Sequence, residues 1–251
     1  MAKCGSDAFD LAQRGERMNV AAVIQHTSGE YLGLIEDHLE GRKIRFQYYR
    51  PFASGGSLPG PDLPADALFL LGGGPWGAAG TRDLPTLDRE VELARLYLEK
   101  GTPIVGFGVG AQILALASGG RAEPAELAFE MLNVRRTRDD ALNGFLPEEF
   151  SQVIYMRDFP VPPAGAKIHA EDERGRPAVW EIAQNAYGFA GNPGIKLGMV
   201  EDLIMDFEEV PANTAEGLME LRRLQTKLED ELVPIMTGLV QCTKLMNSGV
   251  I

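Results

Sequence analysis

Residues 103–120 read PIVGFGVGAQILALASGG, and this stretch decides the fold. A short apolar run, residues 103–107, leads through closely spaced glycines into a second apolar run, residues 111–117, which ends at a Gly-Gly pair. A strand, a sharp turn and a helix in this order are how α/β enzymes expose a nucleophile, because small neighbours permit the strained backbone of the turn. The start of the helix then favours negative charge. The sequence therefore predicts an α/β sheet with a site at this turn.

The alternation of strands and helices continues on the N-terminal side of this turn. Apolar runs predict strands over residues 20–25, 44–48 and 67–71. Apolar residues at near-helical spacing predict helices over residues 30–39 and 87–100. Repeated β-α units of this kind predict a doubly wound, mostly parallel sheet with helices on both faces.

The second half of the chain follows a different pattern. From about residue 134 to residue 188, short alternating runs are separated by turns. They include residues 151–156, 167–170 and 178–182. We expect these runs to form antiparallel strands laid against the parallel sheet.

The closing segment, residues 214–246, is mostly helical, with an interruption expected at Pro234. One apolar stripe follows this helix: Leu218, Leu221, Leu224, Leu228 and Leu232. The stripe could pack on its own domain or on another subunit of a homo-oligomer. Packing on its own domain is the default expectation.

The chain has 251 residues, 45% of them hydrophobic, which suits one large α/β domain. We assign this domain to residues 18–246. It follows a polar, aperiodic N-terminal extension, residues 1–17, that could be disordered, and it precedes a short tail, residues 247–251. The extension has no apolar segment like that of a secretory signal, so we expect a cytoplasmic protein.

Charge and composition argue against several classes of function. The formal net charge is -12 and no basic run is present, so nucleic acid is not an expected partner. Apolar stretches fall far short of the roughly 20 residues of a membrane span. Cys4 and Cys242 are too few for a disulfide framework and are expected to be free thiols. His26, His38 and His169 lack the spacing of metal ligands, so we expect no metal and no cofactor.

Two segments of the sequence carry a resemblance to a known family. Residues 106–112, Gly-Phe-Gly-Val-Gly-Ala-Gln, resemble the nucleophile elbow of class I glutamine amidotransferases, Gly-x-Cys-x-Gly-x-Gln, with Gly108 in place of the catalytic cysteine. Residues 188–194, Gly-Phe-Ala-Gly-Asn-Pro-Gly, resemble the second signature of that family, Gly-x-Gln-Phe-His-Pro-Glu. Asn192 stands at the position of the histidine and Gly194 at that of the glutamate.

The resemblance covers most of residues 18–246. It includes Gln-His at residues 25–26, Gly-Gly-Gly-Pro at residues 72–75, which resembles the oxyanion strand of the family, residues 126–129, and Asp158 with the proline-rich segment after it. It implies a three-layer, flavodoxin-like α/β fold.

The resemblance also implies that glutamine hydrolysis is lost. The reaction needs a thiol, a base to ionise the thiol and an acceptor to orient that base. Gly108 and Gly194 have no functional side chain, and the amide of Asn192 cannot take up a proton near neutral pH. A thiol delivered from Cys4 or Cys242 is the remaining route, and neither cysteine has an activating local context. We therefore expect no glutaminase activity.

What remains is a turn whose backbone N–H groups can face an oxyanion or a carboxylate, although its glycines could also serve the turn alone. The residues that we expect to contact a ligand surround the presumed cleft: His26, Gly73, Gly74, Trp76, Gly108, Val109, Gln112, Tyr155, Arg157, Asp158 and Asn192. Trp76 and Tyr155 could stack on the ligand or simply pack in the core. Arg157 and Asp158 could bind its charged ends. His26 could act as an acid or base, or merely pack.

Two functions are consistent with this pattern. The first is a catalytically degenerate homologue that binds a small carboxylate or amide ligand, or serves as a regulatory or scaffolding subunit of a synthetase or other partner enzyme. The second is an enzyme with repurposed chemistry in the same cleft, a hydrolase or transferase acting on a γ-glutamyl or other amide-type metabolite. A co-purifying partner would favour the first, and a closed polar pocket with a titrating group of shifted pKa would favour the second.

Overall fold

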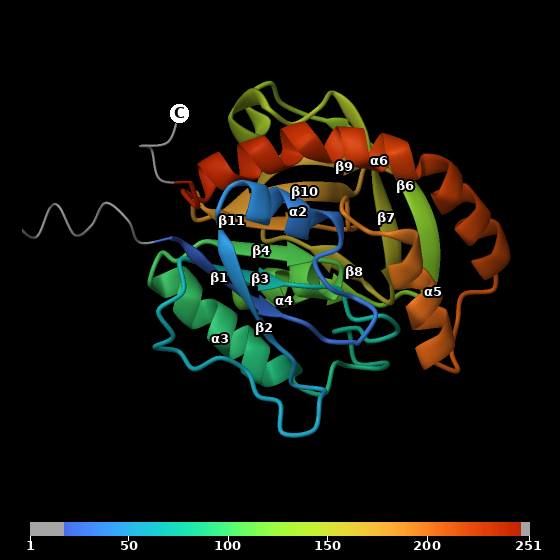
Figure 1. Cartoon of the computed structure of the whole chain (residues 1–251), viewed down its shortest axis with the longest axis horizontal. Helices are drawn as coiled ribbons and strands as arrows, with labels where there is room; N and C mark the ends of the chain where they lie inside the picture. The colour runs from blue at the N-terminus through green and yellow to red at the C-terminus, as the bar shows by residue number, and fades with distance from the viewer. Residues whose placement is uncertain (1–17, 247–251) are drawn as a thin grey trace, which may run out of the picture.

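The computed structural model describes residues 18–246, which are built around a mixed sheet of nine strands (Figure 1). In chain order these strands are β1 (Val20–Ile24), β2 (Arg45–Tyr49), β3 (Ala67–Leu70), β4 (Ile104–Phe107), β6 (Ala128–Arg136), β7 (Glu149–Met156), β9 (Lys167–Asp172), β10 (Pro177–Ile182) and β11 (Ala186–Phe189). A separate sheet pairs β5 (Arg121–Glu123) with β8 (Phe159–Val161). The extension expected at residues 1–17 and the tail expected at residues 247–251 lie outside the described residues.

The strand order of the large sheet is β2-β1-β3-β4-β11-β10-β9-β6-β7. The strands β2, β1, β3, β4 and β11 are parallel neighbours. This arrangement is that of flavodoxin-like folds, whose ligands bind at the carboxyl ends of the strands. From β11 onward every pair is antiparallel. The predicted doubly wound sheet and its antiparallel second half are both confirmed.

Helices cover both faces of the sheet because successive strand residues point to opposite sides. The helices are α2 (Leu34–Gly41), α3 (Leu87–Glu99), α4 (Val109–Ala117), α5 (Leu197–Asp206) and α6 (Thr214–Cys242), with a short 3-10 turn, η1 (Ala141–Gly144). Val23 and Phe69 belong to the core shared with α2 and α6, whereas Ile24 and Leu70 belong to the core shared with α3 and α4. The expected three layers are therefore present, with α6 and α3 on opposite sides of the molecule (Figure 1). None of the helices in the described part is long and apolar enough to cross a membrane.

The helix predicted over residues 30–39 begins only at Leu34, so its predicted start was wrong. Gly33, just before it, has φ +64°, a backbone conformation that side chains rarely adopt. A Cβ at this position would also lie 2.4 Å from the carbonyl oxygen of Gly194. Residues 28–33 consequently form a loop between β1 and α2, and this loop places Glu30 beside the candidate site.

Two further differences concern the C-terminal part of the chain. The helix α6 passes through Pro234 without the predicted interruption. The proline removes one helical hydrogen bond, but burial of Leu232, Ile235 and Met236 around it fixes the helix on the domain. The helix α5 was not predicted.

The leucine stripe of α6 packs on its own domain. Leu221, Leu228 and Leu232 are buried, and Leu218 and Leu224 pack at the edge of the same apolar layer. The default expectation for the stripe is therefore confirmed.

Candidate functional site

The turn between β4 and α4 has the backbone geometry of a nucleophile elbow. Gly108 occupies it with φ +55° and ψ -119°. Gly110 allows the tight approach, because a Cβ at that position would lie 2.1 Å from the carbonyl oxygen of Leu70. A Cβ at Gly108 itself would meet nothing closer than the Cα of Gly72 at 3.6 Å. The turn thus keeps room for a side chain but has none.

The second degenerate segment follows β11 and closes against β7. The backbone of Asn192 pairs with Val153, and its side-chain oxygen accepts a 2.8 Å hydrogen bond from the N–H of Gly194. A Cβ at Gly194 would lie 2.7 Å from Cγ1 of Ile35 on α2. Ile35 therefore fills the space into which a glutamate at position 194 would have to extend.

A carboxylate from outside the predicted set lies against the loop after β3 and lines the cavity beside Gly108. The side chain of Glu30 is buried, and its Oε2 accepts a hydrogen bond from the N–H of Gly74. It lies directly on Gly72, where an added Cβ would come within 1.8 Å of Oε1. Burial raises the pKa of Glu30 to about 7, although the Gly74 hydrogen bond and the nearby His26 oppose the shift. Glu30 thus occupies the N–H group of Gly74 that was expected to face a ligand.

His26 lies behind Glu30 at the end of β1 and is buried. Its Nδ1 is 3.0 Å from the carbonyl oxygens of Leu71 and Gly72, and its Nε2 is 2.8 Å from the carboxylate of Glu90 on α3. Burial lowers the pKa of His26, but the charge and hydrogen bond of Glu90, with smaller contributions from Gly72 and Glu30, leave the pKa raised. Because both ring nitrogens face acceptors, the geometry fits an imidazolium that donates on both sides.

A small cavity of about 10 Å³ lies between Glu30 and the elbow. Glu30, Gly108, Tyr155 and Asn192 contribute to its lining. The hydroxyl of Tyr155 is buried without a hydrogen-bond partner among the described residues. Burial, followed by the charges of Glu30 and Glu209, raises the pKa of Tyr155 to about 12. A volume of this size holds about one water molecule and no metabolite.

Other predicted site residues hold the surrounding backbone. Gln112 of α4 donates a 2.7 Å hydrogen bond to the carbonyl oxygen of Arg157, while its own side-chain oxygen has no partner within the described chain. Asp158 accepts hydrogen bonds from the N–H groups of Ala78, Ala79 and Ala125, at 2.9, 2.9 and 3.1 Å. The Asp158 carboxylate is thus turned toward the backbone and away from the cavity.

The remaining predicted residues lie around the loop after β3. A Cβ at Gly73 would lie 2.7 Å from Cγ1 of Val109, so these two residues pack on each other. Trp76 is half-buried and packs at the edge of the α3–α4 core, with the guanidinium of Arg82 4.8 Å from its ring centroid. Arg157 binds the carbonyl oxygen of Pro75 at 3.2 Å. Of the predicted set, only Gly108, Tyr155 and Asn192 line the cavity itself.

Glu30 and Glu90 are the main site residues absent from the predicted set. Glu30 stands between Gly29 and Gly33, and two glycines so close together argue against a helix starting at residue 30. That signal was present in the sequence. The pairing of Glu90 with His26 joins residues 64 positions apart and has no local signature.

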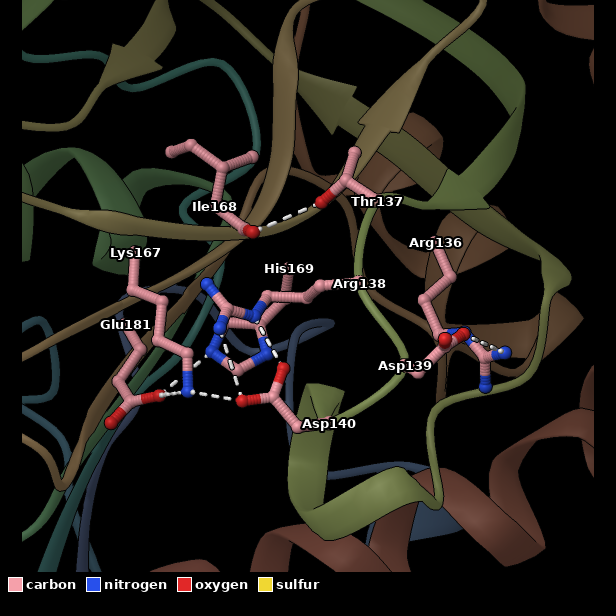
Figure 2. A network of polar contacts seen from close by, with 9 residues as sticks. All are labelled: Arg136, Thr137, Arg138, Asp139, Asp140, Lys167, Ile168, His169 and Glu181. Atoms are coloured by element: carbon pink, nitrogen blue, oxygen red, sulfur yellow. Dashed lines mark hydrogen bonds and ion pairs between the residues drawn. The ribbon is translucent and has the colours of Figure 1, made fainter.

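A second polar cluster lies on β9, β10 and the loop before η1 (Figure 2). His169 Nε2 is 2.7 Å from the carboxylate of Glu181, and Lys167 Nζ is 3.3 Å from that of Asp140. Arg138 is paired with Asp140 as well. Positive and negative side chains balance in this cluster, which fastens the loop to the sheet. Within residues 18–246, no group of three or more His, Cys, Asp or Glu side chains is placed to hold a metal ion.

Comparison with known proteins bears on the fold. No protein-family model matches the sequence, and no curated protein matches it. Among solved structures, a glutamine amidotransferase of Methylobacillus flagellatus is similar with a TM-score of 0.76 at 20% identity, covering 90% of this chain and 96% of that one. A glutamine amidotransferase of Thermotoga maritima gives a TM-score of 0.75 at 20% identity, with 91% and 100% covered.

A Thermoplasma acidophilum protein assigned as one of the subunits of GMP synthase is a more distant neighbour. Its TM-score is 0.53 at 17% identity, with 84% of this chain and 99% of that chain covered. At such identities the likeness establishes the fold: this chain has the fold of glutamine amidotransferases.

Proposed function

We propose that this chain is a glutamine amidotransferase homologue that does not hydrolyse glutamine and that serves as a ligand-binding, regulatory or scaffolding subunit of a partner enzyme. The observation that carries the proposal is the state of the elbow. Gly108 supplies no nucleophile. The N–H group of Gly74, which could otherwise bind an oxyanion, donates a hydrogen bond to the carboxylate of Glu30. An oxyanion has no free donor at Gly74 while Glu30 lies there.

The base and acid positions support the same proposal. Asn192 has no group that takes up a proton near neutral pH, and its oxygen already accepts a hydrogen bond from Gly194. Ile35 leaves no room for a longer side chain at Gly194. Both positions thus lack the side chain that glutamine hydrolysis would require, and the space next to Gly194 is filled.

A nucleophile supplied from another part of the chain finds no support in the described residues. Cys242 lies on α6 beside Tyr187, and burial raises the pKa of its thiol. It does not line the cavity at Gly108. Cys4 lies outside the described residues.

A role beside a partner enzyme is supported by the kind of protein that shares this fold. One structural neighbour is assigned as one of the subunits of GMP synthase. The proposed partner is accordingly a synthetase or another enzyme that includes this fold among its subunits. We further place the protein in the cytoplasm, where such an enzyme would meet it.

The alternative is an enzyme with new chemistry in the same cleft, and one observation favours it. A buried carboxyl with a pKa of about 7 is suited to accept and return a proton at neutral pH, and Glu30 lies beside a cavity of one water molecule. Glu30 would then activate that water against a γ-glutamyl or other amide-type bond. The cavity of about 10 Å³ weighs against this reading, because a substrate requires the site to open.

A substrate screen with the matched variant Glu30→Gln separates the two functions. The purified protein is incubated with glutamine, γ-glutamyl amides and other amides, and the products are followed by mass spectrometry. The non-catalytic proposal predicts no turnover by either protein. Turnover that is lost in Glu30→Gln would establish the alternative and overturn the proposal.

A further inference from the structure

The segment between α5 and α6, residues 207–213, lies against the loop that follows β3. Phe207 lies against the loop after β3, where its Cε2 would be 3.3 Å from a Cβ at Gly74. Asp206, at the end of α5, is bonded to Ser28, and Asn213 donates a 2.8 Å hydrogen bond to the carbonyl oxygen of Phe129. One end of the segment is thereby attached to the loop after β1 and the other end to β6.

Glu209 makes the central contact of this segment. Its two carboxylate oxygens are bonded to two guanidinium groups, those of Arg82 and Arg157. Burial raises the pKa of Glu209, but hydrogen bonds and attraction from both arginines outweigh this effect and leave the pKa lowered. The carboxylate is therefore held as an anion.

The two arginines are arranged as a receptor. The Arg157 side chain is only 6% exposed, and its Nε is held by the carbonyl oxygen of Pro75. Arg82 is fixed over the ring of Trp76 at 4.8 Å. Planar guanidinium groups fixed in this way match carboxylates in geometry and charge. Within the described chain, Arg82 and Arg157 form ion pairs with one carboxylate, that of Glu209, which leaves one positive charge in a protein of net charge -12.

The carboxylate of Glu209 is less firmly fixed than the guanidinium groups that bind it. The Glu209 side chain is 40% exposed, and Val210 beside it is 39% exposed. A carboxylate that replaces Glu209 would keep both guanidinium groups paired, so the exchange leaves neither arginine without a partner. A carboxylate ligand must still displace Glu209, which the chain holds next to the two arginines. This competition lowers the apparent affinity of the protein for the ligand.

We propose that Arg82 and Arg157 form a binding site for a small carboxylate, and that Glu209 occupies this site as an exchangeable latch. A small ligand fits better than a protein surface because Arg157 is buried behind the rim. Displacing Glu209 releases the segment 207–213, so that Phe207 can move away from Gly74, whose N–H group binds Glu30. The inference rests on the proposed function, because it names the ligand class and the gate of the same site.

The test is titration calorimetry with glutarate on the wild-type protein, Glu209→Gln and the matched control Glu208→Gln, whose side chain is exposed on the same segment. Removing the latch should tighten glutarate binding by at least about tenfold, while Glu208→Gln should bind as the wild type does. The double variant Arg157→Met/Glu209→Gln should lose the gain. Equal affinity of Glu209→Gln and wild type would overturn the inference, as would tight binding by the double variant.

Glu209→Gln leaves Arg157 buried without its partner, so its circular dichroism spectrum is compared with that of the wild type first. If that variant does not fold, Glu209→Asp replaces it, because the shorter side chain weakens the latch and keeps the charge. The same tightening is expected, and its absence would equally overturn the inference. Ammonia release from glutamine is measured in the same samples: its appearance would contradict the proposed function, whereas failure to bind glutarate would contradict the latch alone.

Discussion

Replacing Glu30 with glutamine is predicted to change how the stability of the protein depends on pH. Burial raises the pKa of Glu30 from 4.5 to about 7 in the folded state. The folded protein therefore holds this proton more tightly than the unfolded chain does. Stability from this group is complete below pH 4.5 and is lost as the pH rises to about 7.

The size of the effect follows from the shift. Each pH unit corresponds to about 1.4 kcal/mol, so ionising Glu30 lowers the free energy of unfolding by about 3 kcal/mol. Glutamine cannot ionise and does not incur this loss. The raised pKa of His26 acts in the same direction, because its stabilisation in the wild type is also lost as the pH rises and Glu30 contributes to it. Any cost of fitting the amide onto Gly74 is independent of pH and cancels when two pH values are compared.

The assay is urea unfolding of the wild type and Glu30→Gln at pH 5 and pH 8.5. Relative to the wild type, the variant should gain about 3 kcal/mol between the two pH values, or roughly 6 °C or more in Tm. The control is Glu40→Gln, an exposed carboxylate on α2, for which the difference from wild type should be the same at both pH values. The reasoning is refuted if the difference in unfolding free energy between Glu30→Gln and the wild type is also the same at both pH values.

Three further substitutions test the account of the site and the fold. Gly108→Cys should fold, because the nearest atom to its Cβ is 3.6 Å away, and the positive φ should lower its free energy of unfolding in urea by about 1–3 kcal/mol. A failure to fold would contradict the space seen at the elbow. Asp158→Asn should lose about 1–3 kcal/mol of unfolding free energy, because one of its side-chain oxygens is replaced by an NH2 group that cannot accept from backbone N–H groups. The control Asp230→Asn, at an exposed position, should change little, and equal losses would show that the contacts of Asp158 do not stabilise the fold. Leu228→Ala should lose about 2–5 kcal/mol without changing the mass seen in analytical ultracentrifugation, and a dissociated oligomer would assign the stripe to a subunit interface instead.

The parallel half of the fold was predictable because its strands are continuous apolar runs and its helices have a regular apolar period. The elbow was equally predictable, since Gly106 and Gly110 are required by close backbone approach, Gly108 has a positive φ, and the three stand at fixed spacing. Features of this kind depend on residues that are adjacent in the sequence. The interruption predicted at Pro234 was wrong for the opposite reason. The local preference of proline against helix was overridden by burial of the residues around it.

The contents of the site were less predictable. The positions without a catalytic side chain could be identified from the sequence, but the carboxylate of Glu30 that lies beside them could not. Glu30 was assigned to a helix, and only the closeness of Gly29 and Gly33 pointed to a loop. Arg157 was expected to bind a charged end of a ligand, and the structure pairs it with Glu209, 52 positions away. Contacts across such distances depend on the tertiary fold and have no period or motif in the sequence.

The central claim is that this chain does not hydrolyse glutamine, and the most direct measurement is ammonia and glutamate release from glutamine by the purified protein, alone and with a candidate partner synthetase. A glutamine amidotransferase with an intact triad serves as the positive control, and Gly108→Cys tests whether the thiol alone restores activity. The account predicts no release in any sample except the positive control. Release by the wild-type protein, alone or with the partner, would contradict the account.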